Sequence, residues 1–211
     1  MAAAITTQTP IEIIVVDDGS SDRTYSVAHD FSVTHNSTFL TAITIRQNPK
    51  TMGIGHNFRE VAKLAQGEYY RMVCGDNVES VATHEAIFDA IGTADMIIPV
   101  YAQVANKPWY RMLLSNLFSQ LINLASGNRV GYYNGSAVVK TSEVVKTRIR
   151  FDGFCFQAEL LVQLLARGLS YRELTLTAVH HAESSALKWH NFKDAFFLFT
   201  DILFQRAVCA F

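Results

Sequence analysis

The stretch IEIIVVDDGSSD, residues 11–22, decides the fold. Residues 11–16 are apolar and mostly β-branched except for Glu12, which is typical of a buried parallel strand. The acidic and glycine-containing residues that follow predict a loop at the carboxyl end of this strand, and Asp22 predicts the cap of a helix that runs to about Phe31. The paired carboxylates of Asp17 and Asp18 are costly there unless a metal ion, a ribose, a base edge or other hydrogen-bond donors meet them.

The rest of the chain alternates between strand and helix patterns. Further strands are predicted over residues 39–45, 69–73, 96–100 and 171–179. Helices are predicted over residues 56–65, 81–91, 107–125 and 156–167, and from about 191. This alternation predicts a doubly wound α/β sheet, whose ligands bind beyond the carboxyl ends of the strands. A second acidic segment, Cys74-Gly75-Asp76-Asn77, follows one of these strands, so we expect it at the same edge as Asp17 and Asp18.

Composition excludes several classes of protein. The 211 residues are 49% hydrophobic and 18% charged, which excludes a disordered chain. A net charge of −1 lacks the basic excess of a nucleic-acid binder, so no nucleic-acid partner is expected. Three scattered cysteines favour a reducing compartment, and the N-terminus has no secretory signal pattern. The longest apolar stretch, residues 195–211, contains Asp201 and Arg206 and is shorter than the ~20 residues that span a bilayer.

Several motifs together resemble family 2 glycosyltransferases. Residues 15–22 resemble the V-D-D-G-S-x-D signature of that family, residues 53–57 its Gly-rich loop, and residues 65–70 the segment that precedes its metal-binding D-x-D. Residues 154–160 and 168–174 are similar to segments of the dolichol-phosphate mannose synthase branch. The resemblance implies a single GT-A domain over residues 1–211, a Rossmann-like, mostly parallel sheet flanked by helices. It assigns about residues 11–100 to the nucleotide sugar and about 101–211 to the acceptor.

The resemblance also implies a donor site. It assigns nucleotide-sugar binding to Asp17, Asp18, Gly19, Ser20, Gly53, Asp76, His180 and Lys188. Asp76 is implied as the metal ligand for Mg²⁺ or Mn²⁺, because hard divalent ions prefer oxygen ligands and neutralise a departing diphosphate. Cys74 stands where the family has the first carboxylate of D-x-D, and a neutral thiol is a poor ligand for Mg²⁺.

The acceptor side centres on the amphipathic segment WYRMLLSNLFSQLINLAS, residues 109–126. Its apolar residues recur at helical spacing, so the apolar face packs either on the core or at a membrane surface. The family resemblance assigns Arg111 and Ser115, with Lys107 one turn earlier, to the phosphate of a lipid acceptor. It assigns Gln157 and Glu159 to the catalytic pocket, where Glu159 is either a base for a hydroxyl acceptor or a structural partner of a nearby arginine.

The function that the resemblance implies is inverting transfer of a sugar from a UDP- or GDP-sugar to a lipid phosphate, above all polyprenyl phosphate, or to a glycan. We expect a cytoplasmic enzyme of cell wall biogenesis, associated peripherally with the inner face of the membrane. Family members begin with a strand and a helix before the D-D-G-S strand, whereas ten residues precede it here. We therefore expect the first strand to be missing, and the alternative function is that of a non-catalytic or truncated GT-A remnant acting as a binding protein.

Overall fold

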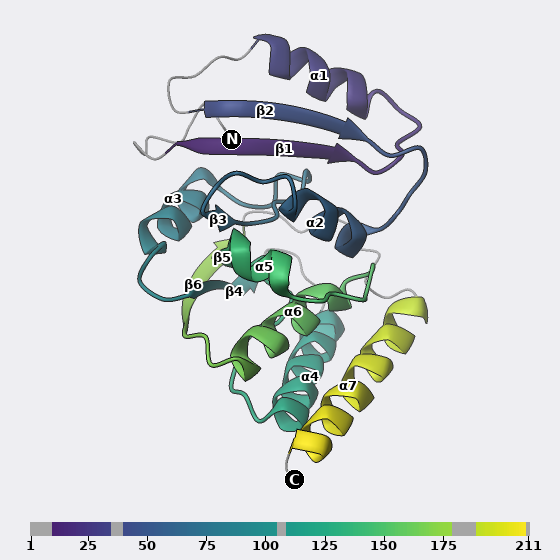
Figure 1. The fold of residues 1–211 in the computed structure, drawn as a ribbon, viewed down its shortest axis with the longest axis vertical. Coiled ribbons are helices and arrows are strands. Elements are labelled where there is room, and N and C mark those ends of the chain that lie inside the picture. The colour runs from purple at the N-terminus through teal and green to yellow at the C-terminus, as the bar shows by residue number, and fades with distance from the viewer. Residues whose placement is uncertain (1–9, 35–39, 105–108, 179–188, 210–211) are drawn as a thin grey trace.

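The computed structural model describes residues 10–34, 40–104, 109–178 and 189–209 (Figure 1). The strands are β1 (Ile11–Asp17), β2 (Leu40–Gln47), β3 (Tyr69–Tyr70), β4 (Met96–Val104), β5 (Val138–Lys140) and β6 (Tyr171–Ala178). The helices are α1 (Thr24–Thr34), α2 (Ile54–Ala62), α3 (Val81–Ala90), α4 (Trp109–Ser126), α5 (Thr141–Lys146), α6 (Cys155–Ala166) and α7 (Trp189–Cys209).

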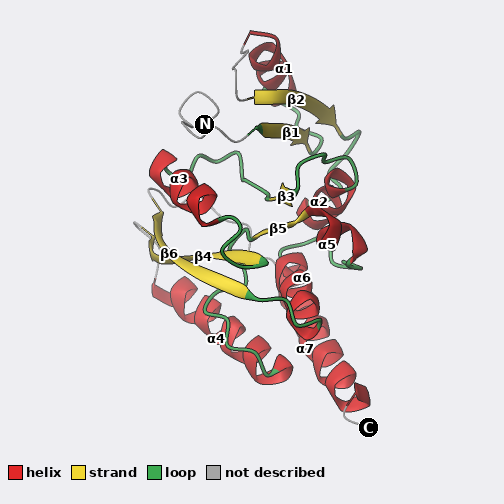
Figure 2. Ribbon diagram, turned by 60° about the vertical axis from the view of Figure 1, so that its left-hand side comes forward, coloured by secondary structure: helices red, strands yellow, loops and turns green. Residues whose placement is uncertain are grey.

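The strands form two sheets. β1 and β2 make a parallel pair in which Asp17 lies opposite Gln47. The other sheet has the order β3-β5-β4-β6, with β4 and β6 parallel and both pairings of β5 antiparallel. Among the described strands, no pairing joins one sheet to the other. The predicted α/β class, with parallel strand pairs flanked by helices, is confirmed, and Figure 2 shows the two sheets one above the other.

Antiparallel pairing is more frequent than the sequence predicted, because β5 was not anticipated. β5 has three residues, which is too short for a period of two to be recognised. The strand predicted over 69–73 is also shorter than expected, since only Tyr69 and Tyr70 pair with β5. The chain then leaves the sheet at Arg71, whose guanidinium donates to Glu79. The short helix α5 was likewise missed, whereas every predicted helix is present with small shifts at its ends.

The main core lies around the four-stranded sheet and α6. Phe156 on α6 is 0% exposed, and its ring centroid lies 4.9 Å from that of Phe58 on α2. Phe58 in turn contacts Tyr70 at 4.9 Å between centroids, which ties α2 and β3 to the same cluster. A smaller cluster around Ile87 and Ile97 fixes α3 against β4. These contacts position the loop after β3, which carries Asp76.

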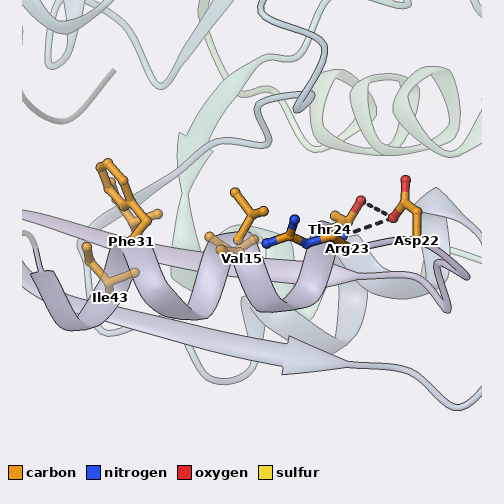
Figure 3. A pocket seen from close by; sticks show the side chains of 9 residues that line it. Val15, Asp22, Arg23, Thr24, Phe31 and Ile43 are labelled. Carbon is orange, nitrogen blue, oxygen red and sulfur yellow. Dashed lines mark hydrogen bonds between the residues drawn. The ribbon is translucent and has the colours of Figure 1, made fainter.

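The β1–β2 sheet is packed less tightly. α1 lies against one face of it, and none of the residues of α1 is buried. Between the helix and the sheet is an apolar cavity of about 740 Å³ (Figure 3). It is lined by Ile13, Val15, Asp22, Arg23, Thr24, Val27, Ala28, Phe31 and Ile43. The predicted cap is present, since the Asp22 carboxylate accepts from the backbone N–H of Thr24 at 2.9 Å.

This difference in packing predicts different costs for truncating two phenylalanines. Phe156→Ala should lower the free energy of unfolding by about 3–5 kcal/mol, because it opens a cavity in the core. Phe31 is 40% exposed, so Phe31→Ala should lower the free energy of unfolding by about 1 kcal/mol or less. Urea denaturation of both variants measures the two values. Equal costs would contradict the assignment of the core.

Candidate functional site

Asp17 ends β1 and is 3% exposed. Its Oδ1 accepts from the backbone N–H of Ser20 at 3.0 Å, and its Oδ2 accepts from Nε2 of Gln47 at 2.9 Å. The hydrogen bonds from Ser20, followed by that from Gln47, outweigh burial and hold the pKa of the Asp17 carboxyl below its ordinary value of 3.8. Asp17 therefore stays ionised and fixes the turn that begins at the end of β1.

Asp18 binds the loop that follows β2. Its Oδ1 accepts from Nδ2 of Asn48 at 2.7 Å and from the backbone N–H of Met52 at 2.9 Å, and its Oδ2 accepts from the backbone N–H of Gly53 at 3.0 Å. Partial burial raises the pKa of this carboxyl, but hydrogen bonds from the Asn57 amide and from these three donors outweigh it and lower the pKa below 3.8. The carboxylates that the sequence indicated thus face hydrogen-bond donors of the protein itself.

Two glycines allow the turn after β1 and the loop after β2 to approach their neighbours this closely. Gly19 has φ +80°, and a Cβ there would lie 2.8 Å from the carbonyl carbon of Lys50. Gly53 has φ +100°, and a Cβ there would lie 2.7 Å from the carbonyl oxygen of Asp152. The Gly-rich loop is therefore in contact with both the turn after β1 and the segment before α6. The structure brings Asp17, Asp18, Gly19, Ser20 and Gly53 together.

Glu159 on α6 is 2% exposed and its carboxylate is engaged by its own chain. Its Oε2 accepts from the backbone N–H of Arg150 at 2.8 Å, and its Oε1 accepts from Nε of Arg150 at 2.7 Å. Phe151 donates its backbone N–H to Oε2 at 3.3 Å. These are the contacts of a structural partner of an arginine, the second of the two roles considered for this residue.

Gln157, the other residue assigned to the catalytic pocket, lies on α6 two residues before Glu159. Its amide nitrogen donates to the carbonyl oxygens of Asn134 and Gly135, each at 3.0 Å, in the amide orientation that satisfies both. The side chain oxygen of Asn134 is buried and makes no hydrogen bond among the described residues. Gln157 thus joins α6 to the tyrosine- and glycine-rich segment before β5.

Asp76 lies on an exposed turn in the loop between β3 and α3. Its Oδ1 accepts a long hydrogen bond of 3.4 Å from the backbone N–H of Val78, and the next residue, Asn77, has φ +54°. Partial desolvation, followed by the charges of Asp76 and Glu79, raises the pKa of the exposed Cys74 thiol. Cys74 therefore remains a thiol and offers Mg²⁺ no anionic ligand. In the described part of the chain, no three His, Cys, Asp or Glu side chains are grouped as metal ligands.

A buried polar cluster beside this loop was missed by sequence reasoning. Arg71 donates to Glu79 Oε1 at 2.5 Å and contacts Nδ1 of His84 at 3.2 Å, and Tyr101 donates its hydroxyl to the same Glu79 oxygen. Its four members come from the loop after β3, from α3 and from β4, so no local pattern marks them. The signal that the sequence offers is a pair of opposite charges, Arg71 and Glu79, at the two ends of the loop that carries Asp76.

α4 turns its polar stripe toward the protein and leaves most of its large apolar side chains exposed. Ser119 is buried, and Tyr132 and Ser115 are hydrogen-bonded to each other. Leu113 and Leu117 on the opposite face are 59% and 49% exposed. Ile122 and Ala125 of the same helix are buried in the main core, with Phe118 packed against it, so α4 contacts the core through part of its apolar residues and leaves the others exposed. Each helix in the described part of the chain is too short or too polar to span a bilayer.

Three residues assigned to the site lie outside the described residues. They are Lys107, His180 and Lys188. Arg111 lies on the first turn of α4, four residues before Ser115 on the same helix. Asp17, Asp18, Asp76, Arg111 and Ser115 of the predicted set lie within the described residues.

The hydrogen bonds of Asp18 predict a pH-dependent effect of Asp18→Asn. The variant loses charge-assisted bonds to Met52 and Gly53, which should cost about 1–2 kcal/mol at neutral pH for a half-buried group. Because the pKa of Asp18 is lowered by folding, its contribution is present above the ordinary value of 3.8 and is lost as the pH falls through the lowered pKa.

Urea denaturation from pH 7 to pH 2.5 measures this effect. The difference between the wild type and Asp18→Asn should shrink at the acidic end. Asp89→Asn, at an exposed position on α3, is the control and should leave stability nearly unchanged. A difference that is constant across this pH range would contradict the assigned role of Asp18.

The solved structures that share this fold include two of mycobacterial proteins. The crystal structure of glucosyl-3-phosphoglycerate synthase from Mycobacterium tuberculosis in complex with UDP superimposes with a TM-score of 0.63 at 11% identity, covering 95% of this chain and 82% of that one. A crystal structure described as that of a mycobacterial protein gives a TM-score of 0.64 at 12% identity, covering 95% of this chain and 76% of the other. At these identities the likeness shows the fold alone.

Curated relatives match over a short region. The uncharacterized proteins Rv1520 of Mycobacterium tuberculosis and Mb1547 of Mycobacterium bovis are each 32% identical over 75 residues, which is 36% of this chain and 20% of the relative. The matched region thus spans about a fifth of the length of these relatives. The model of the family "Glycosyl transferase family 2" matches residues 2–145, well over half of the chain, and does not single out the dolichol-phosphate mannose synthase branch. The chain therefore belongs to glycosyl transferase family 2.

Proposed function

We propose that this protein transfers a sugar from a nucleoside diphosphate sugar to a phosphate-bearing acceptor. The observation that carries the proposal is the arrangement at the carboxyl end of β1, where Asp17 fixes the turn after the strand and Asp18 holds the Gly-rich loop. In open α/β sheets this is the edge where nucleotides bind. Membership of the glycosyltransferase family and the likeness to a UDP-bound glucosyl-3-phosphoglycerate synthase support a nucleotide sugar as the donor.

The residues present fit a divalent ion whose ligands come mostly from the phosphate oxygens of the nucleotide sugar and from water. Asp76 offers one exposed carboxylate and Asn77 a side-chain amide, and both are hard oxygen donors that suit Mg²⁺ or Mn²⁺. Phosphate oxygens and water would complete the coordination. When bound, the ion supplies neutralisation of the departing diphosphate. Asp76 is thus the proposed protein ligand, and Cys74 has no part in it.

The acceptor is proposed to be a phosphate ester, because this choice agrees with the described side chains. An ionised phosphate oxygen is already a nucleophile, so the protein needs to orient it and to balance its charge rather than remove a proton. Arg111 and Ser115 lie one turn apart on the inward-facing stripe of α4, and a guanidinium and a hydroxyl suit phosphate. Glu159, whose carboxylate is engaged by Arg150 and Phe151, is not needed as a base.

The outer surface of α4 and α7 favours a lipid as the carrier of that phosphate. The two helices pack side by side, and Figure 1 shows them together at the C-terminal end of the molecule. Among the described residues, eight exposed large apolar side chains lie on α4 and four on α7. They are Trp109, Tyr110, Met112, Leu113, Leu114, Leu117, Leu121, Leu124, Phe196, Phe197, Leu203 and Phe204. We name this set the α4–α7 surface.

The chemistry of the α4–α7 surface resembles that of an interfacial helix. Trp109 and Tyr110 stand at one end beside Arg111, and α4 contains no acidic residue. Such a surface suits the boundary between head groups and acyl chains, with the cation toward anionic lipid. Polyprenyl phosphate, which is presented at that boundary, is therefore the proposed acceptor, and the protein is proposed to bind the membrane peripherally.

The transfer activity is tested directly with a panel of UDP- and GDP-sugars. The acceptors are a short polyprenyl phosphate and 3-phosphoglycerate, with Mg²⁺ or Mn²⁺ present. We expect transfer to the polyprenyl phosphate, and Asp76→Ala should lower turnover about a hundredfold by removing an interaction that strengthens in the transition state. Asp89→Ala, which is exposed on α3, is the matched control and should retain activity.

Each outcome of this assay decides a part of the proposal. Transfer to 3-phosphoglycerate alone would contradict the lipid acceptor but keep the donor chemistry. No transfer from any nucleotide sugar, or full activity of Asp76→Ala, would favour the non-catalytic binding protein.

Membrane binding is tested by sedimentation with vesicles that contain or lack anionic lipid. The wild type should sediment with the anionic vesicles, and the double variant Leu113→Ser/Leu117→Ser should bind at least tenfold less, because it removes apolar area from the α4–α7 surface. The control is Leu64→Ser/Val145→Ser, which changes two exposed apolar residues near α2 and on α5. Equal loss in both double variants, or no dependence on anionic lipid, would refute the interfacial role.

A further inference from the structure

The loop that carries Asp76 is closed by a buried ion pair. Arg71 lies at its start and Glu79 near its end, and their side chains are 10% and 16% exposed. Arg71 also donates from Nε to the carbonyl oxygen of Ser136 at 3.2 Å, and Ser136 donates its hydroxyl to the carbonyl oxygen of Met72. The two ends of the loop are thus fixed to each other and to the segment before β5, with Asp76 between them.

A tyrosine connects this pair to the neighbouring strand. Tyr101 on β4 donates its hydroxyl to Oε1 of Glu79, the oxygen that also accepts from Arg71. The neighbouring His84 is 3% exposed, and burial and the charge of Arg71 lower its pKa although Glu79 opposes them. A neutral His84 accepts from Arg71 and adds no charge, so the pair is balanced without a further ion.

The contacts continue from Tyr101 to the acceptor helix. The ring of Tyr101 meets that of Tyr132 edge to face, with centroids 6.4 Å apart and an interplanar angle of 89°. Tyr132 is hydrogen-bonded to Ser115 on the inward stripe of α4. The residues Arg71, Glu79, Tyr101, Tyr132 and Ser115 therefore form one continuous series of contacts between the Asp76 loop and α4. We name this series the tyrosine bridge.

We infer that Glu79 and Tyr101 are positioning residues that set the distance between the donor's diphosphate at the Asp76 loop and the acceptor phosphate at α4. This inference rests on the proposed function and adds a role that the family motifs do not assign to these two residues. Neither side chain needs to touch a substrate. Each acts through its neighbours. Their effect on the rate can be large, because misplacement of two reactants by about 1 Å costs on the order of a hundredfold.

The test is a comparison of three tyrosine variants by steady-state kinetics and thermal unfolding. Tyr101→Phe removes the hydroxyl bound to Glu79, and Tyr132→Phe removes the one bound to Ser115 while leaving the ion pair intact. Tyr171→Phe is the matched control. Tyr171 lies on β6, outside the tyrosine bridge, and its hydroxyl donates to the backbone carbonyl oxygen of Arg129 at 3.1 Å. All three lose one hydroxyl and keep the ring.

We expect kcat to fall at least tenfold in Tyr101→Phe and Tyr132→Phe and less than twofold in Tyr171→Phe. The donor KM should change less than threefold in all three, because Asp17 and Asp18 are untouched. The double variant Tyr101→Phe/Tyr132→Phe should lose little more kcat than either single variant, since both interrupt the same series of contacts.

A purely structural role gives a different result. The two bridge variants would then keep kcat within twofold of the wild type, or would lose activity only in proportion to the unfolded fraction seen in thermal melts. Either result overturns the inference while the wild type remains active. If Tyr101→Phe does not fold, Tyr132→Phe decides the question alone. A wild type without transfer activity refutes the proposed function, and this inference with it.

Discussion

The hydrogen bonds that the Asp18 carboxylate accepts from the loop after β2 are the constraint on which the arrangement of this protein depends. The two sheets share no strand pairing among the described strands, so backbone ladders do not hold them together. Instead, Met52 and Gly53 bind Asp18, and Gly55 donates its backbone N–H to the carbonyl oxygen of Asp152 at 2.8 Å. One loop thus joins the end of β1 to the segment that leads into α6.

The same connection continues into the helical part through charged side chains. Arg59 on α2 binds Asp152 at 2.6 Å, and Arg150 binds both Glu159 at 2.7 Å and Asp201 on α7 at 2.5 Å. The exposed pairs contribute little each, whereas loss of a partner of the nearly fully buried Glu159 leaves an uncompensated charge. Asp18 and Glu159 both belong to motifs of the family. Each of them therefore has a structural role, because it binds another segment of the same chain, whether or not it also contacts a substrate.

The sequence predicted the local features well and the distant contacts poorly. The strand and loop of residues 11–22 are recognisable because apolar periodicity, turn residues and paired acids lie within one short window. β5 was missed because three residues carry no period, and the separation of the sheets was missed because pairing partners are not encoded locally. The contact between Tyr101 and Glu79 joins residues 22 positions apart, and no motif marks it. The helical pattern of α4 was visible, but only the structure shows that Leu113 faces outward while Ser119 is buried.

The edge formed by Asp17, Asp18 and the Gly-rich loop is proposed to bind a nucleotide. Isothermal titration of the whole chain with UDP and with GDP, in the presence of Mg²⁺ or Mn²⁺, measures this most directly. We expect saturable binding of one of them at one site per chain, with a dissociation constant below about 1 mM, equivalent to about 4 kcal/mol. We also expect weaker binding in Asp18→Asn, because the loop is then less well held. Absence of heat from both nucleotides up to millimolar concentration, in a protein that is folded by its melting curve, would contradict the proposal.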